Sequence, residues 1–135
     1  MKKSTLILLP ILVMVACSPK PVEIPENFQE ISVPMAQNIF ISLENGDYQT
    51  FRKDFDEKMA ASIDESTFTS MQSMTVERMG TFQNITYQQT TYEEGYLITY
   101  YEVDFSDGNF TLRLVHEPQS PYMIAGFWFP DFPTE

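Results

Sequence analysis

The sequence predicts an α+β domain in which three N-terminal helices pack on a curved, four-stranded antiparallel sheet. Apolar residues recur at helical spacing from residue 34 to residue 79, and from residue 81 the apolar period changes to two. The expected strands follow one another with short turns, which is typical of an antiparallel meander. Helices that are segregated from such a meander form two layers around one core.

Three helices are expected before residue 80. The first begins at Pro34, because proline is favoured in the first turn of a helix, and ends at Gly46, which accepts the left-handed conformation of a helix C-terminus. The second spans residues 48–60 with Asp47 as its cap, and the third spans residues 65–79. The apolar face of the second helix is made by Tyr48, Phe51, Phe55 and Met59.

Four strands are expected after residue 80, over residues 81–91, 96–105, 110–117 and 122–129. Asp107-Gly108 is typical of a tight hairpin turn between the second and third strands. Strict alternation on the last strand places Ala125 and Phe127 on one face and Ile124 and Trp128 on the other.

The second and fourth strands carry more aromatic residues than one buried sheet face needs. Such residues are enriched in interfaces, so they mark a candidate ligand or partner surface. The alternative is that tyrosines suit strands and simply cover the outer face. The candidate surface consists of Tyr96, Tyr100, Tyr101, His116 and Trp128.

Composition excludes several classes of function. The chain has 135 residues with 19 acidic and 8 basic side chains, and its formal charge of −11 makes nucleic acid and anionic membrane surfaces poor partners. One cysteine and one histidine exclude a disulfide framework and a multi-cysteine metal site. Asp54, Asp56 and Glu57 lack the spacing of a calcium loop and indicate a solvated helix face. We expect no metal and no cofactor.

Residues 1–16 are expected to be a bacterial lipoprotein signal peptide. Two lysines precede an apolar stretch over residues 6–16, which would span only about 16 Å as a helix, too little for a bilayer core of ~30 Å. The ending Met14-Val15-Ala16-Cys17 resembles the lipobox, which implies that Cys17 takes lipid and becomes the mature N-terminus. The alternative is an ordinary secretory signal with Cys17 close to the cleavage site.

The expected domain order places a tether and a folded domain behind this anchor. Residues 17–33 comprise the lipidated Cys17 and a proline-rich tether, residues 34–130 form the α+β domain, and residues 131–135 are an acidic tail. The expected location is extracytoplasmic, with the membrane as a partner through the lipid. Ser18 is not the Asp that signals inner-membrane retention in many Gram-negative lipoproteins, which favours the outer membrane if the host has one.

Four motifs between residues 35 and 130 resemble the signatures of a small prokaryotic family, domain of unknown function number three-eight-eight-seven. They are Glu44-Asn45-Gly46-Asp47-Tyr48 with Phe51, Phe55 and Met59; Met79-Gly80-Thr81-Phe82; Tyr100-Tyr101-Glu102-Val103-Asp104-Phe105; and Ile124-Ala125-Gly126-Phe127-Trp128-Phe129. The resemblance implies the nuclear-transport-factor-2-like (cystatin-like) fold, with a cone-shaped cavity between sheet and helices, and often secretion or lipidation. It implies no established activity.

His116, the only histidine, is the candidate catalytic residue. By parity it shares a face with Leu112 and Leu114 and lies at the strand end near the mouth of that cavity. Some enzymes of the superfamily use a histidine or aspartate there as a base, and an ordinary pKa near 6.5 suits that task. No orienting partner for His116 is evident, so a histidine satisfied at the edge of the layer is the alternative.

These observations favour a membrane-anchored, non-catalytic domain that binds a small apolar ligand or a protein partner, through the cavity or through the outer sheet face. One alternative is a cavity enzyme, an isomerase or hydrolase of small hydrophobic substrates that uses His116. Another alternative is a structural spacer or dimerisation module, with a homodimer as its assembly.

Overall fold

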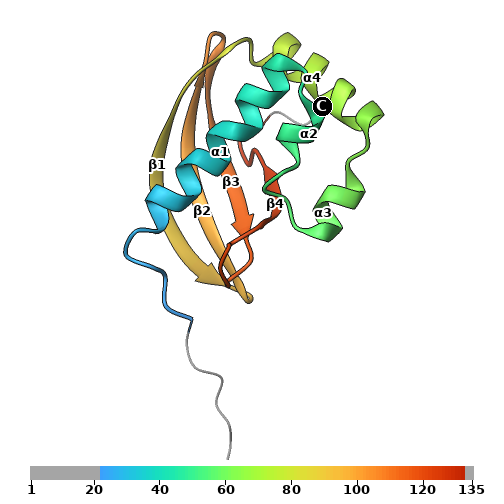
Figure 1. Ribbon diagram of the computed structural model, residues 1–135. Coiled ribbons are helices and arrows are strands. Elements are labelled where there is room, and N and C mark those ends of the chain that lie inside the picture. The colour runs from blue at the N-terminus through green and yellow to red at the C-terminus, as the bar shows by residue number, and fades with distance from the viewer. Residues whose placement is uncertain (1–21, 133–135) are drawn as a thin grey trace, which may run out of the picture.

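The computed structural model describes residues 22–132 and confirms the α+β class. Helices lie on one face of a twisted antiparallel sheet, where α1 runs across the strands and the shorter helices lie on the β4 side (Figure 1). Four helices are described in place of the expected three. In chain order the elements are α1 (Phe28–Asn45), α2 (Tyr48–Phe51), α3 (Glu57–Ser62), α4 (Glu65–Arg78), β1 (Phe82–Glu93), β2 (Tyr96–Phe105), β3 (Gly108–His116) and β4 (Ile124–Trp128).

The strands form one meander in the order β1-β2-β3-β4. β2 and β3 pair without a register shift, from Leu97 opposite His116 to Phe105 opposite Gly108. Each strand begins and ends within two residues of its predicted bounds. The alternating pattern therefore located all four strands, because a half-buried antiparallel strand needs that pattern.

The first helix begins at Phe28, so the expected start at Pro34 and the expected tether over residues 28–33 are wrong. The reason is the burial of Phe28, whose ring meets the His116 ring edge-on with centroids 5.2 Å apart. Burying a Phe side chain contributes about 2 kcal/mol, which offsets much of the penalty of about 3 kcal/mol for an internal proline.

The expected helix over residues 48–60 is broken into α2 and α3. The backbone of residues 54–56 forms a parallel bridge to β4: the Ile124 N–H donates to the Asp54 carbonyl at 2.7 Å, and the Asp56 N–H donates to the Ile124 carbonyl at 2.8 Å. Asp56 then starts a new helix by accepting from the Met59 N–H. A contact from the far end of the chain therefore overrides the local helical period.

The two faces of β4 also differ from the expectation. A register shift in the β3–β4 ladder inserts Ala125 as an extra residue and moves Ile124 to the buried face. Phe127 packs against the core, and Trp128 points to the outer face with 45% of its surface exposed. The prediction that Ala125 shares a face with Phe127 opposite Ile124 is therefore wrong.

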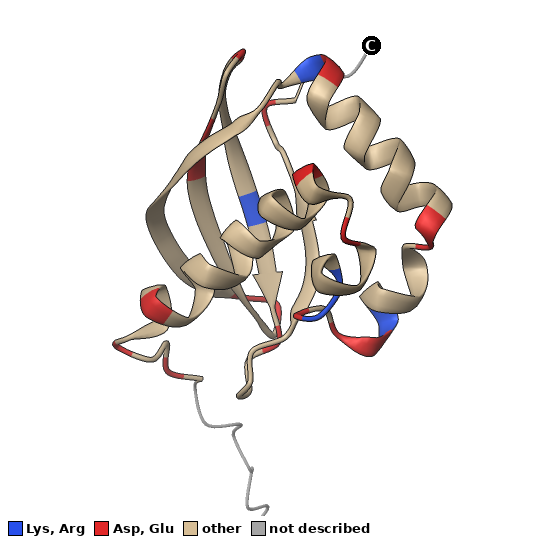
Figure 2. Ribbon diagram, turned by 45° about the horizontal axis from the view of Figure 1, so that its top comes forward, with Lys and Arg blue, Asp and Glu red and all other residues tan. Residues whose placement is uncertain are grey.

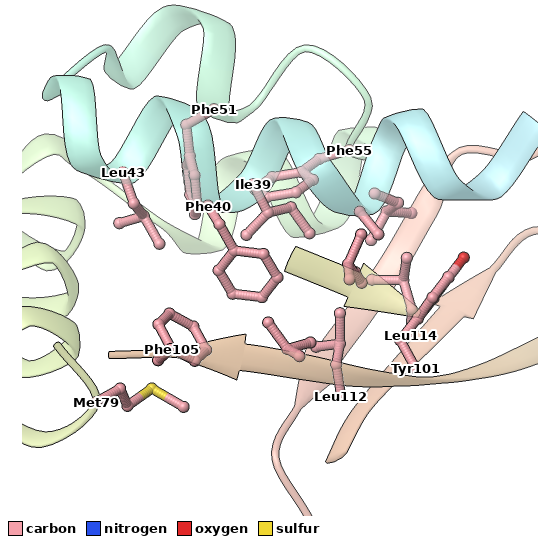
Figure 3. Packing of buried hydrophobic residues seen from close by; sticks show 14 of the residues in the cluster. Ile39, Phe40, Leu43, Phe51, Phe55, Met79, Tyr101, Phe105, Leu112 and Leu114 are labelled. Carbon is pink, nitrogen blue, oxygen red and sulfur yellow. The ribbon is translucent and has the colours of Figure 1, made fainter. Parts of the chain in front are cut away.

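Aromatic side chains fill the space between α1 and the sheet. Phe40 of α1 stacks on Phe82 and meets Phe105 edge-on, with centroids 5.2 and 5.4 Å apart. Figure 3 shows Phe40 and Leu43 reaching from α1 toward Phe105 and Leu112 of the sheet. Among the described residues, this part of the interior is a packed core.

Candidate functional site

His116 is sealed inside the domain. β3 directs its side chain to the face beneath α1, where it is fully buried and in contact with Phe28. Its Nδ1 lies 2.9 Å from the Tyr122 carbonyl oxygen. Because a carbonyl can only accept, Nδ1 carries the proton and Nε2 is an acceptor, for which the described residues supply no partner.

The environment of His116 keeps its imidazole neutral. Burial lowers its pKa from 6.5 to about 4, and the bond to the Tyr122 carbonyl opposes that shift only in part. Among the described residues His116 has no hydrogen bond to a carboxylate. The arrangement lacks the orienting group and the substrate access that a general base requires.

Three further polar side chains occupy the same interior, namely Ser32 of α1 and Thr99 and Tyr101 of β2. Thr99 Oγ1 lies 3.0 Å from Thr90 Oγ1, whereas the Ser32 and Tyr101 hydroxyls find no partner among the described residues. Burial raises the pKa of Tyr101, so its phenol stays protonated at physiological pH. These interior groups are neutral and carry no charge for acid–base chemistry.

The five residues of the expected surface do not lie together. Tyr101 and His116 belong to the buried face of the sheet. Tyr96, Tyr100 and Trp128 lie on the outer face, where Tyr96 and Trp128 are exposed. The grouping of all five into one surface is therefore wrong, because strand parity sends Tyr101 and His116 inward.

Arg113 connects the outer aromatic residues. The register places it between Tyr100 of β2 and Trp128 of β4. Its Nε–H donates to the Tyr100 hydroxyl at 3.2 Å, and its guanidinium carbon lies 3.9 Å from the Trp128 ring centroid. Arg113 was not among the predicted site residues, although its alternation with Leu112 and Leu114 placed it on the outer face.

A groove whose smaller part has mainly apolar walls runs between α4 and the end of β4. It consists of two adjoining open pockets of about 280 and 590 Å³, which share Met71, Phe127 and Trp128. We call these two pockets together the α4–β4 groove. The smaller pocket is also lined by Phe40, Leu43, Met74, Thr75, Met79, Phe129 and Phe132. The larger pocket is also lined by Lys58, Met59, Ser62, Ile63, Tyr96, Val115, Ala125 and Gly126.

The walls of the groove carry methionines and one charged side chain. Met71 and its neighbours are flexible, polarizable side chains that adapt to irregular apolar shapes. Lys58 is the single titratable cation in the walls, and the other polar lining groups are hydroxyls or backbone. Met74 of α4 lines the smaller pocket with 43% of its surface exposed, and nothing in the sequence had marked it as a site residue.

Residues 22–132 show neither a metal centre nor a membrane-spanning helix. No group of three or more His, Cys, Asp or Glu side chains in that range could hold an ion. None of the helices in that range is both long enough and apolar enough to cross a bilayer. Cys17, the signal peptide and residues 18–21 of the expected tether lie outside the described residues.

Comparison with known proteins identifies a family. The model of the family described as "Protein of unknown function (DUF3887)" matches residues 36–127, which confirms the resemblance carried by the four motifs. No curated protein matches the chain.

Two solved structures are distantly similar. One, from Campylobacter jejuni and provisionally named an NTF2-like transpeptidase, is 20% identical with a TM-score of 0.46, covering 70% of this chain and 97% of that chain. The other, an NTF-2 like protein of unknown function from Burkholderia xenovorans LB400, is 13% identical with a TM-score of 0.38, covering 81% and 89%. Nothing about activity follows from likeness at this level.

Proposed function

The chain belongs to the DUF3887 family, and from that premise we propose that it is a lipid-anchored, extracytoplasmic domain that binds small apolar ligands without catalysing a reaction. The observation that carries the proposal is the α4–β4 groove. Its walls combine methionines with Phe127 and Trp128, and they are open to solvent. Pockets with mostly apolar walls and few polar groups are typical of small-molecule binding.

The buried histidine supports binding over catalysis. His116 lines neither pocket of the groove, and its imidazole is neutral and covered by Phe28. A cavity enzyme that uses His116 would need a substrate within hydrogen-bond reach of Nε2. Reaching Nε2 would require Phe28 and the start of α1 to move away.

The anchor rests on the sequence around Cys17. A thiol at the end of a short apolar leader is where lipoprotein processing acts, and two or more acyl chains hold a protein stably at a membrane. With α1 beginning at Phe28, the tether from Cys17 shortens to residues 17–27. Eleven extended residues reach at most about 40 Å, so the groove would stay near the membrane surface, the outer membrane if the host has one.

The single tryptophan of the chain allows a direct test of the groove. Trp128 lines both pockets, so its fluorescence reports an occupant of either one. We would titrate the mature chain, residues 17–135 with Cys17→Ser, with the neutral apolar dye N-phenyl-1-naphthylamine. Binding should quench Trp128 and raise the emission of the dye.

A matched pair of variants locates the binding. Met74→Glu places a charge on an exposed wall residue of the smaller pocket and should weaken dye binding about tenfold, since desolvating that carboxylate costs more than 1 kcal/mol. Val76→Glu adds the same charge to the same helix at a residue that lines neither pocket and is 58% exposed. It should bind the dye as the parent does. Equal effects of the two variants, or no binding by the parent, would refute the proposal.

A protein partner is the second candidate, favoured by the outer sheet face. Trp128 and Tyr96 are exposed there, and Arg113 is held against Trp128. Trp, Tyr and Arg are the residues that most often dominate protein interfaces. Sedimentation of the mature chain at rising concentration tests self-association. A chain that stays monomeric excludes a homodimer, and a dimer that Trp128→Ala weakens supports an interface at the outer sheet face.

A further inference from the structure

The one charged side chain in the walls of the α4–β4 groove has the opposite sign to the net charge of the chain. Lys58 lines the larger pocket. The guanidinium carbon of Arg113 lies 3.9 Å from the ring centroid of Trp128, and that of Arg78 lies 5.6 Å from the ring centroid of Phe132. Arg113 and Arg78 line neither pocket themselves, so Lys58 is the one cation in the walls.

No carboxylate lines either pocket. The chain has 19 acidic residues against 8 basic ones, so a random surface of this size would carry mainly acidic groups. Figure 2 shows acidic positions spread over the helix ends and turns, with few basic positions among them. Asp131, which neighbours Phe132, lines neither pocket and holds both carboxylate oxygens 3.0 Å from the Thr111 backbone nitrogen.

We propose that the α4–β4 groove selects single-chain amphiphiles with an anionic head group, of which a fatty-acid carboxylate is the simplest. This inference rests on the proposed function and specifies its ligand class. The tail lies in the smaller pocket against Met71 and Phe127, whose walls hold no charged side chain. The carboxylate lies at the rim of the larger pocket beside Lys58.

The geometry supports this orientation of the ligand. Lys58 is exposed and forms no ion pair with a carboxylate of the described residues. Its ammonium group is therefore hydrated and available to a ligand carboxylate. Arg113 is different, because stacking on Trp128 and the bond to Tyr100 fix its guanidinium in place. Arg113 therefore adds a fixed positive field at the shared wall, and Lys58 supplies the mobile contact.

The test compares three ligands with the same tail. Dodecanoate, dodecanol and dodecyltrimethylammonium are titrated below their aggregation concentrations at pH 8, with Trp128 fluorescence as the readout. Exposed charge pairs are worth about 0.2–1 kcal/mol, so dodecanoate should bind about 1.4- to fivefold tighter than dodecanol. Dodecyltrimethylammonium should bind more weakly than dodecanol.

Lys58→Gln should abolish the preference for dodecanoate and leave the affinity for dodecanol unchanged. Lys53→Gln is the matched control, because Lys53 is an exposed lysine close in sequence that lines neither pocket. That variant should keep the preference. Added salt should weaken dodecanoate binding to the parent and leave dodecanol binding nearly constant, since only the first depends on charge.

The outcomes separate this inference from the proposed function. Equal binding of dodecanoate and dodecanol overturns the head-group selection while leaving an apolar binding groove. Tightest binding of dodecyltrimethylammonium overturns it as well, because the overall negative charge would then outweigh the one cation in the walls of the groove. Failure of all three ligands and of N-phenyl-1-naphthylamine to bind overturns both proposals.

Discussion

Acid should destabilise the domain through His116. The unfolded chain binds a proton at His116 with a pKa near 6.5, whereas the folded chain binds it only near 4 because the ring is buried. Above pH 6.5 His116 is mainly neutral in both the folded and the unfolded state, so its titration does not change the free energy of unfolding. As the pH falls from 6.5 toward 4 the unfolded state is protonated first, so the free energy of unfolding decreases.

The magnitude follows from the two pKa values. The full shift from 6.5 to about 4 corresponds to roughly 3 kcal/mol at 1.36 kcal/mol per pKa unit. By pH 5 about 2 kcal/mol of this should already be lost relative to pH 7.5. A loss of that size is a sizeable part of the 5–15 kcal/mol that is typical of a small domain.

The assay is urea unfolding of the mature chain at a series of pH values, beside His116→Asn. The asparagine amide can still donate to the Tyr122 carbonyl but does not titrate. The variant should be less stable at pH 7.5 and should lack the decrease between pH 6.5 and 5. The raised pKa values of Asp54 and Glu117 make the free energy of unfolding increase as the pH falls. Both chains carry these two residues, so their contribution is the same in the two pH profiles. Parallel profiles for the two chains would refute the reasoning, since His116 would then be hydrated in the folded state.

Three further results are expected. Gly80→Ala should destabilise the domain by about 3 kcal/mol, because φ is +83° and the new Cβ would lie 1.9 Å from Ser106 Oγ. Gly95→Ala is the control: φ is +89° but the space around it is open, so it should cost only about 1 kcal/mol. Equal losses of unfolding free energy in urea would contradict the clash at Gly80. Asp56→Ala should cost about 1 kcal/mol by removing the cap of α3, and unchanged unfolding would show that the break is held by the β4 bridge alone. Cys17→Ser should take up no fatty-acid analogue in metabolic labelling, and label retained by that variant would refute the lipid anchor.

The parts of the fold that depend on local pattern were predictable from the sequence. The four strands follow from alternation, and Gly46 ends α1 in the left-handed conformation that its position indicated. His116 shares a buried face of β3 with Leu112 and Leu114, as strand parity indicated. In each case the residues that decide the structure are neighbours in sequence.

The parts that depend on distant contacts were not predictable. The break between α2 and α3 exists because the backbone at Phe55 forms a bridge to Ile124. The sequence around either residue does not predict that pairing. The buried face of Ile124 depends on the extra residue Ala125, since one inserted residue moves the side chains before it to the other face. The early start of α1 depends on the space beside His116 that Phe28 fills.

The same distant contacts create the groove and determine how it can respond to a ligand. α4 buries a single residue, Phe68, and its side chains reach α1 through one bond, from Gln72 Nε2 to the Leu43 carbonyl at 2.7 Å. A helix of 14 residues is marginal alone, so α4 is held mainly by these contacts and by its aspartate cap. β4, by contrast, is fixed by the β3 ladder and by the bridge to residues 54–56. The groove therefore has one rigid wall, which carries Trp128, and one compliant wall of methionines. That asymmetry suits ligands that share an anionic end and differ in tail length, because Arg113 is held against the fixed wall while the tail contacts the wall that can move.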